Sequence, residues 1–197
     1  SAGLAKTGFR PIVYTINTFL YLRAFEQIKL DICYANAPVI LVGTGSGLSY
    51  SELGTTHHSL EDLGSLRQFP NLQVLAPSTP EELSDSLNIA YRRCQGPTYI
   101  RIGKKGEVEI DRGKKLIDSS QFLGPYLFSA KKSTDIVAIS SGSISVNVRN
   151  AITRLAEQDV HIDHIIQPQI SPVDLTATKS VLDDYKTIIT VEEHNAV

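Results

Sequence analysis

The chain has 197 residues, of which 42% are hydrophobic and 20% charged, and its formal net charge is −2 at pH 7. This composition predicts a soluble globular protein with a packed core. The charged residues are spread along the chain, so it has neither the basic stripe that nucleic acid requires nor a polybasic anchor for a lipid surface. We therefore expect no nucleic-acid partner and no membrane partner.

The two cysteines, Cys33 and Cys94, lie far apart and lack the short Cys/His spacings of a zinc site. We therefore expect no metal site in this chain and no disulfide framework, which favours a reducing, cytoplasmic location. No apolar run approaches the roughly 20 residues of a membrane-spanning helix, and no leader sequence is evident. Residues 1–8 are typical of a helix end with Gly8 beyond it, so the chain is expected to begin within an element.

Apolar runs typical of strands alternate with helical patterns along residues 11–102. Strands are expected at 11–15, 38–43, 72–76 and 98–102, and helices at 18–34 and from Thr79 to Gly96. Thr79 and Glu82 have the spacing of a capping box, with proline at the first helical position between them. Alternation of this kind predicts a parallel sheet covered by helices.

The periodicity is lost between residues 103 and 133, as expected of an interdomain connection with one short strand or turn. A second βαβαβ unit follows, with strands expected at 135–140, 160–167 and 187–191 and helices at 146–158 and 174–184. The predicted fold class is α/β, with two doubly wound three-layer α/β/α domains and mostly parallel sheets.

The segment most indicative of chemistry is residues 54–63, in which His57 and His58 lie in a glycine-bearing loop. Imidazole exchanges protons near neutral pH. Ser59 and Asp62 have capping-box spacing, which predicts a short helix whose positive end lies just after the histidines. A catalytic loop and an ordinary solvated pair of histidines both remain open.

Two further groups of residues are candidates for ligand binding. Phe19, Leu22 and Phe25 recur every third residue, so they would line one side of a helix, as a ring-binding surface or, more commonly, a core stripe. Arg101 and Lys104 follow the strand at 98–102. Cations at the carboxyl edge of a parallel sheet suit a phosphorylated substrate, and a solvated charge cluster is the alternative.

Taken in order, these segments resemble the thiamine-diphosphate enzymes of the transketolase family. The resemblance extends over nearly the whole chain. It is carried by Ala2-Gly3-Leu4-Ala5, Gly8-Phe9-Arg10-Pro11, Thr18-Phe19-Leu20, Arg23-Ala24-Phe25-Glu26-Gln27, Gly54-Thr55-Thr56-His57, Glu61-Asp62-Leu63, Phe69-Pro70-Asn71, Ala76-Pro77-Ser78, Gly96-Pro97-Thr98 and Val191-Glu192-Glu193-His194.

The resemblance implies that residues 1–106 form the pyrimidine-binding domain, 107–133 a linker and 134–197 the start of the C-terminal domain, both domains being incomplete. It also implies that Phe19, Leu22 and Phe25 hold the aminopyrimidine of thiamine diphosphate. His57 would be the catalytic histidine and would contact the donor sugar. Lys104, with Arg101 nearby, would bind the substrate's phosphate.

The implied activity belongs to carbohydrate metabolism: a transferase moving a two-carbon ketol unit from a ketose to an aldehyde, a sugar or sugar phosphate. The family's Gly-Asp-Gly motif is missing, so magnesium and the diphosphate are expected on a partner domain. The chain would then be the C-terminal subunit of a split transketolase, paired with a diphosphate-binding subunit and/or a second copy as a homodimer.

Departures from the family pattern leave other activities open. The family's catalytic glutamate would precede Ala2, Leu53 stands where many transketolases place a hydroxyl-reading aspartate, and Gly45 where some place a phosphate-binding histidine. The alternatives are a 1-deoxyxylulose 5-phosphate synthase-like activity, a 2-oxo acid dehydrogenase beta-subunit-like activity, and a non-catalytic assembly or regulatory partner.

Overall fold

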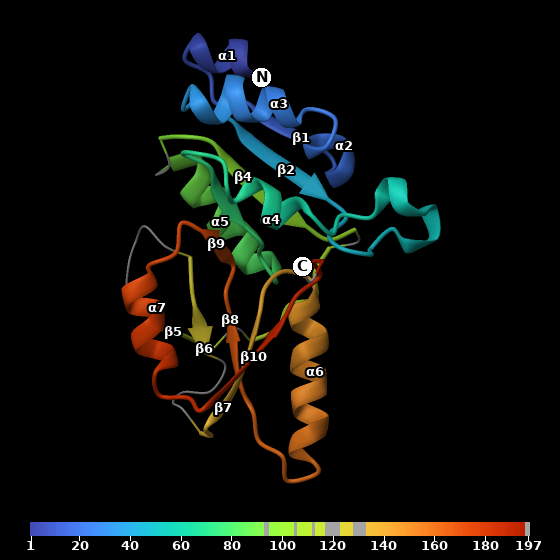
Figure 1. Ribbon diagram of the computed structural model, residues 1–197, viewed down its shortest axis with the longest axis vertical. Helices are drawn as coiled ribbons and strands as arrows, with labels where there is room; N and C mark the ends of the chain where they lie inside the picture. Colours follow the sequence, from blue (N-terminus) through green and yellow to red (C-terminus); the bar gives the residue numbers. More distant parts are fainter. Residues whose placement is uncertain (93–94, 105, 112, 117–122, 128–132, 196–197) are drawn as a thin grey trace.

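The computed structural model describes residues 1–92, 95–104, 106–111, 113–116, 123–127 and 133–195. Two sheets lie one after the other along the long axis (Figure 1). We call residues 1–106 the N-terminal half, which supplies most of the first sheet, and residues 107–195 the C-terminal half, which supplies the second sheet and one strand of the first. Both contain parallel strands with helices on their faces, so the predicted α/β class is confirmed.

The first sheet has the strand order β1-β2-β4-β3-β9. Its parallel strands are β1 (Ile12–Ile16), β2 (Ile40–Thr44), β4 (Thr98–Ile102) and β3 (Gln73–Leu75). The fifth strand, β9 (Gln169–Ser171), pairs antiparallel with β3. β2 is buried along its whole length, as its continuous apolar run predicts for a strand covered on both faces.

Helices cover both faces of the first sheet. On one face, Leu41, Val74 and Tyr99 pack against α2 (Asn17–Tyr21), the π-helical turn η1 (Ile28–Tyr34) and α4 (Asp62–Leu66). On the other, Ile40, Leu75 and Ile100 pack against α5 (Pro80–Arg92). The shorter helices are α1 (Ala2–Lys6), α3 (Phe25–Gln27), η2 (Ser51–Leu53) and η3 (Thr55–His57).

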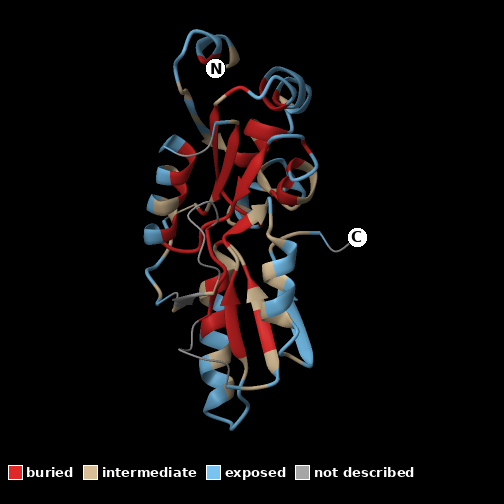
Figure 2. Ribbon diagram, turned by 90° about the vertical axis from the view of Figure 1, so that its left-hand side faces the viewer, coloured by how far each residue is buried: buried red, intermediate tan, exposed pale blue. Residues whose placement is uncertain are grey.

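The second sheet has the order β10-β7-β8-β6-β5. Its strands are β10 (Thr187–Val191), β7 (Ile136–Ser140), β8 (Asp163–Ile166), β6 (Tyr126–Leu127) and β5 (Lys114–Lys115). α7 (Leu175–Leu182) packs on the face of Val137 and Ile165, and α6 (Ile144–Ala156) on the opposite face, that of His164. Buried residues concentrate in the inner strands of both sheets (Figure 2), whereas the edge strand β10 is mostly exposed.

Three local predictions were wrong. The helix expected at 18–34 is interrupted by a turn at 22–24, and Tyr21 before the turn and Ile28 after it both pack into the core on the same face of the sheet. Ser59 does not cap α4: it is fully buried and pairs with Gly47 in a β-bridge. Instead of one short strand, the region 107–133 supplies both β5 and β6.

One of the two hydrogen bonds of the capping box at Thr79 is confirmed: Thr79 Oγ1 accepts the amide N–H of Glu82 at 3.1 Å. No strand was predicted at β9, which crosses from the C-terminal half into the first sheet. The domain limits 1–106 and 134–197 therefore stay a proposal. No helix in the described part of the chain is long and apolar enough to cross a bilayer.

Candidate functional site

His57 ends η3 and lies partly buried against the N-terminal part of α2. Its ring meets the Phe19 ring edge-on with centroids 5.0 Å apart, and the Tyr50 ring lies 5.9 Å away. Thr18 Oγ1 donates to the carbonyl of Thr56 at 2.9 Å, which ties the loop to the helix. The imidazole is thus held half-buried at a defined place, with its Nδ1 2.9 Å from Thr56 Oγ1.

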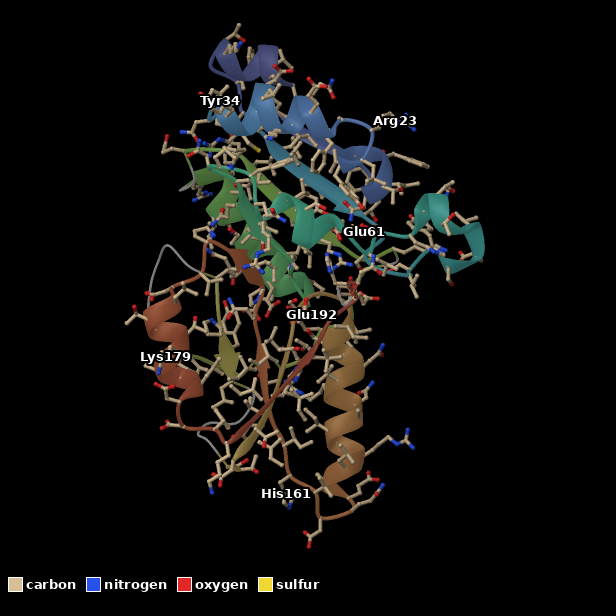
Figure 3. The ribbon with its side chains drawn as sticks, viewed as in Figure 1. Arg23, Tyr34, Glu61, His161, Lys179 and Glu192 are labelled. Atoms are coloured by element: carbon tan, nitrogen blue, oxygen red, sulfur yellow. The ribbon has the colours of Figure 1, made fainter. Side chains whose placement is uncertain are left out.

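Charged side chains flank this aromatic group on two sides. The Arg23 guanidinium lies 5.2 Å from the Phe19 ring centre, and Figure 3 shows this side chain extending from the turn after α2. Lys104 Nζ lies 4.6 Å from the Tyr50 ring centre and forms an ion pair with Glu52. The two cations thus lie against the two aromatic rings that contact His57.

A polar cavity of about 360 Å³ lies next to Lys104. It is lined by Ser49, Glu52, Gly103, Lys104, Gly106, Glu107 and Ser143. Carboxylates accept hydrogen bonds, lysine donates them and serine hydroxyls do both, so this lining suits a ligand rich in hydroxyl groups.

A buried network beneath the histidine loop centres on Asp62. Its carboxylate accepts from Asn17 Nδ2 at 2.7 Å and from the Tyr99 hydroxyl at 2.6 Å, and it pairs with Arg101 Nε at 3.3 Å. Asp62 and Arg101 are only 0% and 2% exposed. Burial, followed by the negative charge of Asp62, raises the pKa of Tyr99, so the phenol stays protonated as a donor.

The sequence-predicted residues fall into two groups. His57 and Phe19 are in contact, and Lys104 reaches them through Tyr50. Arg101 lies apart from this open site, because its guanidinium is buried among Asp62, the Ser59 carbonyl and the Glu193 carbonyl.

The other two predicted ring-binding residues lie further along the chain, beyond the end of α2. Leu22 is 56% exposed, and Phe25 is 38% exposed with its ring 4.7 Å from that of Phe69. The stripe of three side chains is thus divided among α2, the turn that follows it and α3.

Sequence reasoning missed Tyr50 and Glu52, which hold Lys104, and it misassigned Asp62 as a cap. No periodicity marks Tyr50 or Glu52, because they lie in an irregular loop between β2 and the histidines. In the described part of the chain, no group of three or more His, Cys, Asp or Glu side chains could hold a metal ion.

Comparisons with known proteins point in one direction. The family described as "Transketolase, pyrimidine binding domain" matches residues 1–106. A subunit of the apulose-4-phosphate transketolase of Actinobacillus succinogenes is 36% identical over 99% of this chain and 61% of its own length. The 1-deoxy-D-xylulose-5-phosphate synthase of Thermotoga petrophila is 34% identical over 98% of this chain and 30% of its own length.

Solved structures agree in fold. A split-gene transketolase, described as an inactive beta4 tetramer, superposes with a TM-score of 0.75 at 25% identity, over 98% of this chain and 60% of that one. The transketolase of Campylobacter jejuni gives a TM-score of 0.81 at 18% identity, over 99% of this chain and 30% of that one. The chain thus spans 61% or less of these four proteins. With the family match extending over more than half of its residues, the chain belongs to the transketolase family and carries the pyrimidine-binding domain.

Proposed function

We propose that this chain acts as the C-terminal, pyrimidine-binding subunit of a transketolase-like transferase, which moves a two-carbon ketol unit from a ketose to an aldehyde. The observation that carries the proposal is His57 held against Phe19 and Tyr50, with Lys104 joining Tyr50 to a polar cavity, in a chain whose residues 1–106 match the pyrimidine-binding domain. The 36% identity to a subunit of a two-part transketolase supports the same assignment.

Thiamine diphosphate is the cofactor that we propose. Phe19, partly exposed beside His57, suits one wall of a site for a flat heteroaromatic ring. We assign Leu22 and Phe25, which are exposed beyond the end of α2, to the same ring as outlying contacts. We assign the diphosphate and its magnesium ion to a partner subunit. When bound, the cofactor supplies the carbon nucleophile for breaking and forming carbon–carbon bonds.

The chain's own residues then bind, orient and protonate the substrate. His57 is placed to donate a hydrogen bond to a substrate hydroxyl or developing oxyanion and to transfer protons. We assign Lys104 to an anionic group of the substrate and the polar cavity to its hydroxyls. Arg101, buried against Asp62, serves the site indirectly by holding the loop.

Cofactor titration tests the proposal directly. Thiamine diphosphate and magnesium are titrated into the chain by calorimetry, alone and with a diphosphate-domain subunit, and ketol transfer is assayed in the mixture. We expect saturable binding and transfer only in the mixture, both weakened in Phe19→Ala. Absence of binding in the mixture would overturn the proposal.

The similarity to 1-deoxy-D-xylulose-5-phosphate synthases supports one rival activity, because their identity to this chain reaches 34%. Product analysis of the same mixture with pyruvate or a ketose as donor separates the two. Carbon dioxide release from pyruvate would identify the rival, and a shortened aldose from the ketose would identify ketol transfer.

Assembly and location belong to the same proposal. We propose a homodimer and/or a complex with the diphosphate-binding subunit, in which the site is completed at the interface between the two chains. A cytoplasmic location is consistent with Cys33, whose burial raises the pKa of its thiol to about 12 and leaves it unreactive. Cys94 lies outside the described residues.

A further inference from the structure

We infer that the segment Glu193–Asn195 of the C-terminal half is a clamp that positions the histidine loop, with His194 as its main positioning residue. This rests on the catalytic role proposed above for His57. The clamp follows β10 and reaches the N-terminal half at the junction marked in Figure 3 by Glu61 on one side and Glu192 on the other.

The clamp contacts the loop and the start of α4 at consecutive points. The Gly64 amide donates to His194 Nε2 at 3.0 Å. The Asn195 amide donates to the Leu60 carbonyl at 3.0 Å, and Asn195 Nδ2 donates to Glu61 Oε1 at 2.9 Å. Three hydrogen bonds between segments about 130 residues apart in sequence fix the position of one segment on the other.

His194 fits its place in both chemistry and shape. Because Nε2 accepts the Gly64 amide, the ring proton must be on Nδ1, which lies 3.1 Å from the Asn195 carbonyl oxygen. A Cβ added to Gly64 would lie 2.7 Å from His194 Cε1, so only glycine at position 64 lets the ring approach.

Arg101 extends the clamp beneath the loop. Its Nη2 donates to the Ser59 carbonyl at 3.1 Å and to the Glu193 carbonyl at 2.9 Å. One buried guanidinium therefore holds the backbone of the loop and the backbone of the clamp together. Because the guanidinium is buried, water cannot take the place of either carbonyl as its hydrogen-bond acceptor. Both hydrogen bonds are therefore strong.

These contacts reach His57 through a short, restrained backbone. Ser59, two residues further on, exchanges backbone hydrogen bonds with Gly47 at 2.9 and 3.1 Å. On the other side, Thr18 holds the Thr56 carbonyl. Both ends of this short segment are restrained, which keeps the His57 ring edge-on to Phe19. The clamp adds to the restraint at the Ser59 end, through Arg101 and through the Leu60 carbonyl, so loosening the clamp weakens the hold on that end.

The test uses His194→Ala in the chain assembled with its diphosphate-domain subunit. We expect kcat to fall about ten-fold with KM nearly unchanged, because a misplaced catalytic group weakens the transition state more than substrate binding. We also expect the His57 ring-proton NMR signals, shifted by the Phe19 ring current, to move toward free-histidine values. His194→Gln, which keeps an acceptor, should restore both; His161→Ala, at the far end of the C-terminal half (Figure 3), should change neither.

A second variant approaches the clamp from the other side. Gly64→Ala improves the intrinsic helix propensity of α4 while displacing His194. Unchanged His57 signals in both His194→Ala and Gly64→Ala would overturn the clamp. The NMR readout needs no turnover, so it decides the clamp even if the assembly shows no ketol transfer and the proposed function fails.

Discussion

His57 lies in a short 3₁₀ turn, where its ring is only partly buried. We therefore expect the ring to contribute little to the free energy of unfolding. We predict that His57→Ala reduces ketol-transfer turnover about a hundred-fold, because general acid–base groups contribute that order of magnitude. The free energy of unfolding should change by less than about 1 kcal/mol, since a partly buried loop side chain fills little core volume.

The measurements are steady-state kinetics and urea unfolding on the same preparations. His58→Ala is the matched control, because His58 lies next in the chain and its Nε2 is 3.3 Å from the Ser51 carbonyl oxygen rather than beside Phe19. Equal losses of activity and stability in His57→Ala would show that the ring is structural.

Glu52 holds Lys104, the residue that we propose for binding an anionic group of the substrate. Its carboxylate forms an ion pair with Lys104 Nζ at the cavity that we assign to the substrate. We predict that Glu52→Gln strengthens inorganic phosphate binding about three-fold, in keeping with the small energy of exposed pairs, and that salt diminishes the difference.

Phosphate titration by NMR measures this effect, with Glu157→Gln as a control for loss of one negative charge. Glu157 lies on the surface just after α6, away from the cavity. Weaker phosphate binding in Glu52→Gln would contradict the prediction.

At the residue scale, the sequence indicated His57, Phe19 and Lys104 because each belongs to a local motif. It could not indicate the position of Arg101. A cation at the end of a strand serves a ligand or a buried carboxylate equally well, and the choice depends on Asp62, nearly forty residues earlier in the chain.

Elements of the C-terminal half are joined to the N-terminal half by a buried row of polar side chains. Arg149 Nε on α6 donates to His164 Nδ1 at 3.2 Å, and His164 Nε2 lies 2.7 Å from Ser140 Oγ. The row continues through Ser145 to Ser78, each hydroxyl 2.9 Å from the next. Because Nδ1 accepts from Arg149, Nε2 carries the proton, so His164 cannot act as the base for Ser140.

Burial, and then the positive charge of Arg149, lowers the pKa of His164 to about 3. The unfolded chain, in which this pKa is about 6.5, therefore binds one more proton between pH 6.5 and 3. We predict that stability falls as pH falls through this window, by about 2 kcal/mol at pH 5 from this group.

Urea unfolding of wild type and His164→Gln between pH 7 and 4 tests this prediction. The variant should be less stable than wild type at pH 7, because the substitution breaks the buried row. Its stability should depend less steeply on pH, because it lacks the titrating imidazole. The exposed His161→Gln serves as control. Parallel pH curves for wild type and His164→Gln would contradict the depressed pKa.

At the element scale, prediction succeeded where several local signals agreed. The strand Thr98–Ile102 and the start of α5 at Pro80 were placed correctly, because β-rich composition, proline and a capping threonine agree there. The turn at 22–24 was missed because its residues have no breaker signal, and only packing over the sheet requires the bend.

For the whole molecule, the C-terminal half contributes one strand to the first sheet, and buried contacts join the two halves. β9 belongs to the C-terminal half but pairs with β3, and Ile170 packs against the core of the first sheet. We predict a single cooperative unfolding transition, with a calorimetric enthalpy equal to the van't Hoff enthalpy.

Differential scanning calorimetry measures this, with Ile170→Ala as the probe. The variant should lower the stability by about 1–2 kcal/mol and keep a single peak, because β9 ties the C-terminal half to the first sheet. Two resolved transitions, of which only one moves in Ile170→Ala, would show that the halves fold independently.

The alternation of strands and helices predicted two α/β units, yet the antiparallel crossing of β9 could not be predicted. Its three residues are too few for a period-two pattern, and their partner lies about 95 residues earlier in the chain. Pairing between strands so far apart in the chain produces no recognisable pattern in the sequence around either strand.

The close fit of Gly47 and Gly64 to the clamp limits how such subunits can recombine. A Cβ on Gly47 would lie 2.6 Å from the Glu193 Cβ, just as one on Gly64 would collide with His194. A chimaera that joins the N-terminal half of one relative to the C-terminal half of another would have mismatched surfaces at this contact, unless it keeps glycine at positions 47 and 64 opposite Glu193 and His194. Gene shuffling at residues 107–133 is therefore constrained by sterics at two positions far outside the crossover.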